Sequence, residues 1–84
     1  MLKEEQFYWP TIDEWYPNFP RNTVRVSVYR AESSKEPHRI CVWGADDFGM
    51  ELDTRDVTLI RRIVRELPNP LTIEWLKGRG FVPA

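Results

Sequence analysis

Several residue types that support chemistry are scarce in this chain of 84 residues. The single cysteine, Cys41, excludes an internal disulfide and a zinc site built from cysteines. The single histidine, His38, stands just before a predicted strand, where we expect an ordinary surface residue. The four glycines form neither a phosphate-binding loop nor a Gly-x-Ser-x-Gly motif. These absences predict that the protein is not an enzyme, has no catalytic residues and uses no cofactor.

Long apolar runs are also missing. No stretch approaches the about 18 apolar residues of a membrane-spanning helix, so we expect no membrane partner. The chain begins with MLKEE, without the apolar core of a signal peptide, and we therefore expect a cytoplasmic location. The net charge of −1 disfavours a protein that binds nucleic acid mainly through its phosphates.

Aromatic and other hydrophobic residues are plentiful. Hydrophobic residues make up 42% of the chain, which is enough for a folded core despite 30% charged residues. We therefore predict one small domain, residues 1–84. Six aromatic residues and three prolines lie within residues 7–20. We expect this aromatic and proline-rich segment to pack on the domain or to extend from it.

Three segments have the alternation of half-buried strands. Residues 23–30 alternate valines with polar or aromatic residues, and residues 38–44 and 48–52 repeat the pattern less regularly. Short polar connections favour antiparallel neighbours. The sequence therefore predicts a three-stranded antiparallel meander.

The hairpin between the second and third predicted strands includes an acidic loop of three or five residues around Ala45-Asp46-Asp47. The apolar residues of both strands share one face only if the loop has an odd length, which sets Trp43 opposite Gly49. The two aspartates of the loop then lie at its tip, too far from Glu51 to share a metal ion. We predict no metal site.

One long helix is predicted over 54–67. Asp53 or Thr54 caps its start, and its apolar side chains lie on one side with arginines on the other. Shorter helices are expected near 12–16 and at 72–77, because each segment follows or begins with a capping threonine. The predicted fold is α+β, with the meander packed on the long helix.

The outer face of the predicted sheet collects aromatic and arginine side chains. Tyr, Trp and Arg are enriched at the energetic centres of protein interfaces. We therefore predict a small non-enzymatic domain, a regulator or an inhibitor, that binds a protein partner. The predicted binding residues are Trp43, Tyr29, Arg25 and Arg39, or Trp9 and Trp15 if the N-terminal segment is exposed. In the alternative arrangement, the N-terminal segment folds over the outer face and hides its aromatic residues.

Two other functions remain as alternatives. Three strands followed by a helix resemble DNA-binding domains that lay a sheet in the major groove, and the helix–three strands–helix order resembles double-stranded-RNA-binding domains, although no motif of either family is present. Nucleic acid would contact the outer sheet face or the helix back, where Arg61, Arg62 and Arg65 lie. The further alternative is a structural subunit or homodimer that pairs through a strand edge or an aromatic patch.

Overall fold

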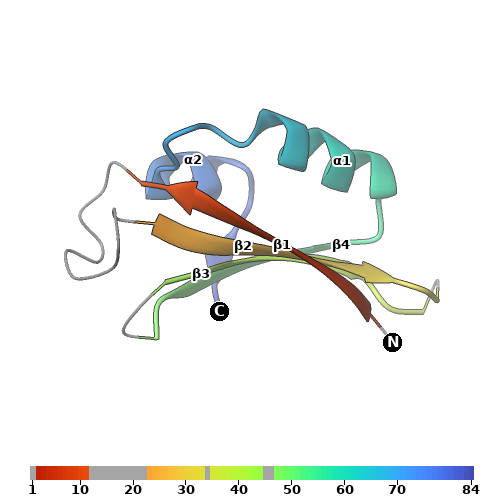
Figure 1. Cartoon of the computed structure of the whole chain (residues 1–84). Coiled ribbons are helices and arrows are strands. Elements are labelled where there is room, and N and C mark those ends of the chain that lie inside the picture. Colours follow the sequence, from red (N-terminus) through yellow and green to blue (C-terminus); the bar gives the residue numbers. More distant parts are fainter. Residues whose placement is uncertain (1, 12–22, 34, 45–46) are drawn as a thin grey trace.

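The computed structural model describes residues 2–11, 23–33, 35–44 and 47–84, with side chains from Glu5 onward. The predicted helix near 12–16 lies outside these ranges. The described residues form a five-stranded antiparallel sheet, and two helices cover one of its faces (Figure 1). The fold is therefore α+β, as predicted, but the sheet is larger than the predicted three-stranded meander.

The strands follow one another across the sheet in chain order. They are β1 (Leu2–Pro10), β2 (Thr23–Ala31), β3 (His38–Trp43), β4 (Gly49–Thr54) and β5 (Val82–Pro83), and the helices are α1 (Val57–Glu66) and α2 (Ile73–Gly78). β2 and β3 lie close to their predicted ranges. β4 continues past the predicted end at residue 52, and the long helix consequently starts later than predicted.

The sheet contains two edge strands that the alternation pattern does not predict. β1 pairs with β2 along its whole length, with Phe7 opposite Val26. Its first half is charged at three successive positions, so only Phe7 and Trp9 mark the face that packs on the core. β5 contributes two residues opposite Met50 and Glu51, which is too short for a periodic signal.

The register between β3 and β4 confirms the predicted hairpin. Trp43 lies opposite Gly49, and the connecting loop has the odd length that parity requires. The backbone N–H of Gly44 donates to the carbonyl of Phe48 at 3.1 Å and closes the base of the loop. Asp47 adopts the left-handed conformation with φ of 60°, which aspartate tolerates better than most residues.

The start of α1 differs from the prediction. The side chain of Asp56 accepts hydrogen bonds from the backbone N–H groups of Thr58 and Leu59, so Asp56 is the N-cap. The predicted caps, Asp53 and Thr54, belong to β4 instead. The prediction was wrong because an aspartate or threonine shortly before a helix looks the same in the sequence whether it caps the helix or ends the preceding strand.

α2 has the cap that its sequence predicts. The hydroxyl of Thr72 accepts a hydrogen bond from the backbone N–H of Trp75 at 3.1 Å. Gly80 follows the helix with φ of 98°, a conformation that glycine adopts without a steric penalty. This turn directs Phe81 into the core, where it is buried.

The core lies between the sheet and the two helices. Its buried side chains are Val24, Val26, Val28, Ile40, Val42 and Met50 from the strands and Ile60, Ile63, Leu67, Leu71, Leu76 and Phe81 from the helical half. Successive side chains of a strand point to opposite faces. The residues between these core positions therefore lie on the face of the sheet away from the helices.

Candidate binding face

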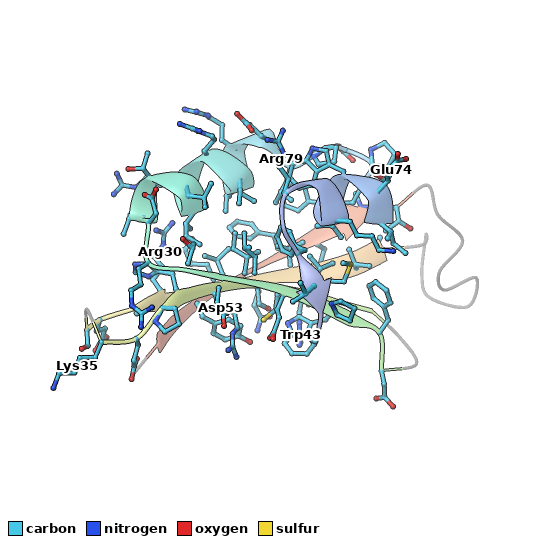
Figure 2. The ribbon with its side chains drawn as sticks, turned by 180° about the vertical axis from the view of Figure 1, so that it is seen from behind. Arg30, Lys35, Trp43, Asp53, Glu74 and Arg79 are labelled. Carbon is cyan, nitrogen blue, oxygen red and sulfur yellow. The ribbon has the colours of Figure 1, made fainter. Side chains whose placement is uncertain are left out.

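Polar and aromatic side chains cover the sheet face opposite the helices. We call it the open face, because no helix or strand within the described ranges packs on it. Trp43 and Asp53 lie on this side, whereas Glu74 and Arg79 lie on the helical side (Figure 2). The open face comprises Gln6 and Tyr8 of β1, Arg25, Ser27 and Tyr29 of β2, Arg39, Cys41 and Trp43 of β3, and Glu51 and Asp53 of β4.

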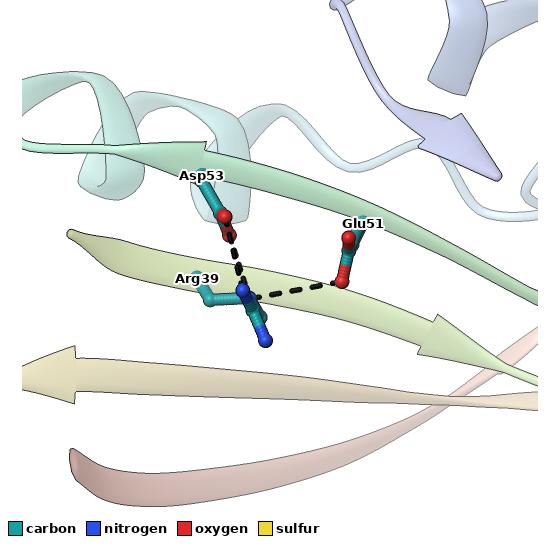
Figure 3. A network of polar contacts seen from close by, with 3 residues as sticks. All are labelled: Arg39, Glu51 and Asp53. Carbon is teal, nitrogen blue, oxygen red and sulfur yellow. Dashed lines mark hydrogen bonds and ion pairs between the residues drawn. The ribbon is translucent and has the colours of Figure 1, made fainter. Parts of the chain in front are cut away.

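Arg39 is bound by two carboxylates at one end of the open face (Figure 3). Its Nε donates to Asp53 Oδ1 at 2.6 Å and its Nη2 donates to Asp53 Oδ2 at 3.0 Å. Nε also lies 3.7 Å from Glu51 Oε2. Asp53 is the register partner of Arg39 on the neighbouring strand, so the pairing follows directly from the strand alignment.

This ion pair shifts the titration of both partners. The hydrogen bond from Arg39 lowers the pKa of Asp53, and the same hydrogen bond raises the pKa of Arg39. Both side chains are about two-fifths exposed, so solvent screens their attraction. A pair of this exposure stabilises the fold by less than about 1 kcal/mol.

Arg25 lies at the other end of the open face in a different environment. Its register partners are Tyr8 on β1 and Trp43 on β3. Its guanidinium carbon lies 5.8 Å from the centroid of the Trp43 ring, which is a cation–π contact. Within the described ranges no carboxylate pairs with Arg25, so its charge is not neutralised locally.

Trp43 stands between two shallow hollows. The first, of about 260 Å³, is lined by Tyr8, Arg25, Trp43 and Gly44. The second, of about 220 Å³, is lined by Tyr29, Arg39, Cys41, Trp43 and Glu51. The indole lies beside Gly49, since a Cβ at that position would be in ordinary van der Waals contact with Cε3 of Trp43, at 3.7 Å. The tryptophan therefore forms a wall common to both hollows.

Three polar atoms of the open face are buried without a hydrogen-bond partner among the described residues. They are Nε of Arg25, Oγ of Ser27 and Nε1 of Trp43. Buried polar groups are normally satisfied, and each unsatisfied one costs about 1–3 kcal/mol. Arg25 and Trp43 are register partners, and Ser27 follows Arg25 on the same face of β2. Two of the unsatisfied atoms thus lie together at one end of the open face, and the third, on Ser27, lies in mid-strand opposite Cys41.

The structure brings together four of the predicted binding residues. Arg25, Tyr29, Arg39 and Trp43 all lie on the open face. Trp9 lies on the opposite face, packed against the core with its ring 6.1 Å from that of Phe7. Trp15 lies outside the described residues. The predicted cluster therefore consists of the four sheet residues, with Trp9 turned away from them.

Tyr8 is a member of the open face that the sequence pattern does not indicate. It lies beside Arg25 on the edge strand and is 69% exposed. Its position on this face depends on the pairing of β1 with β2. Because Phe7, Tyr8 and Trp9 are all aromatic, the sequence shows no alternation at this end of β1 that could have identified the strand.

The remaining candidates for chemistry have structural roles or lie apart. Nδ1 of His38 accepts the backbone N–H of Ala31 at 2.9 Å, which ties together the ends of β2 and β3. Cys41 is buried in the middle of the sheet. Among the residues that the structure describes, no three His, Cys, Asp or Glu side chains come close enough to hold a metal ion. Asp46 of the acidic loop lies outside them.

Comparisons with protein-family models, with curated proteins and with solved structures found no match for this chain. Within the described ranges, neither helix has the length and apolar character needed to cross a membrane. The case for a function therefore depends on the geometry of the open face.

Proposed function

We propose that the protein is a small non-enzymatic binding domain, a regulator or an inhibitor, whose open face contacts a protein partner. The main support is the pair of unsatisfied donors, Nε of Arg25 and Nε1 of Trp43, which belong to two residues that line one hollow. A partner that covers this end of the face and supplies hydrogen-bonding groups would remove their energetic cost. Tryptophan, tyrosine and arginine are also the residue types that contribute most at interface centres.

The charge of the open face favours a protein over a nucleic acid. Arg25 and Arg39 are balanced there by Glu51 and Asp53, and Arg39 is already paired with both acids. A phosphate-binding surface needs a surplus of positive charge. A mixed surface, with hollows on either side of an aromatic wall, is typical of protein interfaces.

The test begins with affinity capture by the wild-type protein and continues with the purified partner. Replacing Trp43→Ala removes the wall between the hollows, and we expect the affinity to fall at least about 30-fold, the loss typical of a hot-spot residue. Arg79→Gln is the matched control, because Arg79 also stacks on a tryptophan, Trp75, at 5.2 Å but lies in the helical layer. Equal retention of the partner by wild type and Trp43→Ala would show that this face was wrongly chosen.

A second candidate function is nucleic-acid binding through the back of α1. Arg61, Arg62 and Arg65 are exposed there, and no described carboxylate pairs with them. Titration with duplex DNA and RNA at two salt concentrations tests it, because phosphate contacts weaken steeply as salt rises. The absence of salt-sensitive binding at micromolar protein would remove this candidate.

Self-association through the edge of the sheet is the remaining alternative. β1 is a nine-residue strand at the edge, and edge strands present backbone groups that can pair with another chain. Size-exclusion chromatography at several concentrations distinguishes a homodimer from a domain that binds a different protein. An elution volume that is independent of concentration and matches a monomer would exclude self-association.

A further inference from the structure

We propose that the hollow lined by Tyr8, Arg25, Trp43 and Gly44 receives the carboxylate of an Asp or Glu side chain from the protein partner. This inference rests on the proposed function, since it names the chemical group that anchors the partner on the open face. Below, we call this hollow the Arg25 hollow.

The unsatisfied atoms of the Arg25 hollow are both hydrogen-bond donors. Nε of Arg25 and Nε1 of Trp43 each carry a hydrogen and accept nothing. The two residues face each other across β2 and β3 and line the same hollow. A ligand that satisfies them must therefore bring acceptors, and a carboxylate brings two oxygens with about four lone-pair sites.

The charge of Arg25 makes an anionic acceptor preferable to a neutral one. No described carboxylate pairs with Arg25, in contrast to Arg39, which has Asp53 as a bidentate partner. Hydrogen bonds between arginine and a carboxylate are roughly twice as strong as those between neutral groups. The Trp43 ring that lines the hollow lowers its polarity, which strengthens such a bond.

The surroundings favour a side-chain carboxylate over a chain terminus or a phosphate. Terminal carboxylates and phosphates are often bound by successive backbone N–H groups, but the N–H of Gly44 already donates to Phe48. The open face also balances two arginines with two acids, so it lacks the surplus of positive charge that a chain of phosphates needs. A single carboxylate within an otherwise neutral protein segment avoids both difficulties.

Access to the hollow requires a side-chain movement. Solvent does not reach Nε of Arg25 or Nε1 of Trp43 in the unbound fold. Tyr8 lines the same hollow and is 69% exposed, so its rotation costs little packing. Exposed side chains change rotamer within nanoseconds. In the proposed complex, Tyr8 rotates to admit the carboxylate to the two donors, without a change in the sheet.

The first test uses capped amino acids as probes and the Trp43 indole N–H as the reporter in NMR spectra. The resonance is assigned by its loss in Trp43→Phe. We expect acetyl-Glu-methylamide to shift it saturably, with a dissociation constant on the order of millimolar, and acetyl-Gln-methylamide to leave it in place. The shift disappears in Arg25→Gln and persists in Arg79→Gln, whose arginine stacks on Trp75 and pairs with Glu66.

Three results of this titration would overturn the inference. The first is an equal shift by the glutamine probe, which would show that charge is not recognised. The second is an unchanged response in Arg25→Gln, checked to be folded by its remaining resonances. The third is a tighter saturable response to inorganic phosphate at matched ionic strength, which would assign the hollow to phosphate groups.

The second test uses the purified partner. Arg25→Gln is expected to weaken binding about 10- to 100-fold, the loss expected for hydrogen bonds to a charged group. Arg25→Lys keeps the charge but loses the planar pair of donors, so its loss is smaller. A partner weakened by Trp43→Ala but unaffected by Arg25→Gln would refute the carboxylate anchor and leave the proposed function intact. A partner unaffected by either would refute the proposed function itself.

Discussion

The two arginines of the open face have the same chemistry and opposite environments. Arg39 lies opposite Asp53, which binds its guanidinium in a bidentate pair. Arg25 lies between Tyr8 and Trp43 and has no carboxylate partner in the part of the chain that the structure describes. The difference comes from the residue that the strand register places beside each one. One end of the face is therefore satisfied internally, and the other has two buried donors without an acceptor among the described residues.

The largest expected effect follows from removing the wall between the two ends. Trp43→Ala should weaken partner binding by about 2 kcal/mol or more, because it removes the aromatic surface of both hollows. Isothermal titration calorimetry with the purified partner measures this loss. Trp43→Phe keeps most of the aromatic surface and should lose less. If Trp43→Ala bound the partner as tightly as the wild type does, neither hollow could be a binding site for the partner.

The next largest effect distinguishes the Arg25 end of the open face from the Arg39 end. Arg25→Gln should reduce partner affinity by about 1.5–3 kcal/mol, because it removes a charged donor that has no carboxylate partner among the described residues. Arg39→Gln should reduce it by less than about 1 kcal/mol, because that arginine is already paired. Both variants are measured against the same partner in one buffer. The reverse order of the two losses would place the anchor at the Arg39 end.

Ser27→Ala tests the cost of the unsatisfied group that lies between Arg25 and Tyr29 on β2. The hydroxyl of Ser27 is fully buried without a hydrogen-bond partner among the described residues. Alanine has a hydrogen in place of the hydroxyl, so the buried polar atom disappears. The substitution should therefore raise the free energy of unfolding by about 1 kcal/mol. Urea denaturation measures the change. Destabilisation of similar size would mean that the hydroxyl is satisfied in the folded protein.

The smallest effect concerns the Arg39 end and depends on pH. The hydrogen bond from Arg39 lowers the pKa of Asp53 from its ordinary value of 3.8. The pair therefore stabilises the fold above that value, and the stabilisation is lost as the pH falls through the lower pKa of the folded state. Asp53→Asn should lower the free energy of unfolding by less than about 1 kcal/mol near neutral pH.

Denaturation of wild type and Asp53→Asn over a series of acidic pH values measures this dependence. The difference between the two proteins should shrink as the pH falls, and added salt should reduce it at neutral pH. Arg25→Gln serves as the control, since its arginine has no acidic partner in the described ranges and should leave the acid dependence unchanged. A difference that grows on acidification would contradict the ion pair.

The predictable parts of the fold are those in which one local pattern dominates. The valines of β2 alternate without interruption, and parity alone selects the hairpin register that places Trp43 opposite Gly49. Thr72 caps α2 as predicted. Side-chain direction follows from strand parity. The four predicted binding residues of β2 and β3 could therefore be placed together on one face from the sequence.

The other parts depend on contacts between distant segments. β1 becomes a strand by pairing with β2, and its run of charges at residues 3–5 hides the alternation. Asp53 can cap a helix or pair across a sheet, and only the extension of β4 decides between these roles. The contrast between Arg25 and Arg39 likewise depends on the register. In the sequence, both are arginines within a segment that alternates polar and apolar residues, and nothing local distinguishes them.

The most direct test of the binding face is an NMR titration of the isotopically labelled protein with its purified partner. We predict that the perturbed resonances centre on Tyr8, Arg25 and Trp43, with the Trp43 indole N–H among the largest changes. Resonances of α1 around Arg61 and Arg65 should change little. Perturbations confined to α1, with the Trp43 indole unmoved, would contradict the assignment of function to the open face.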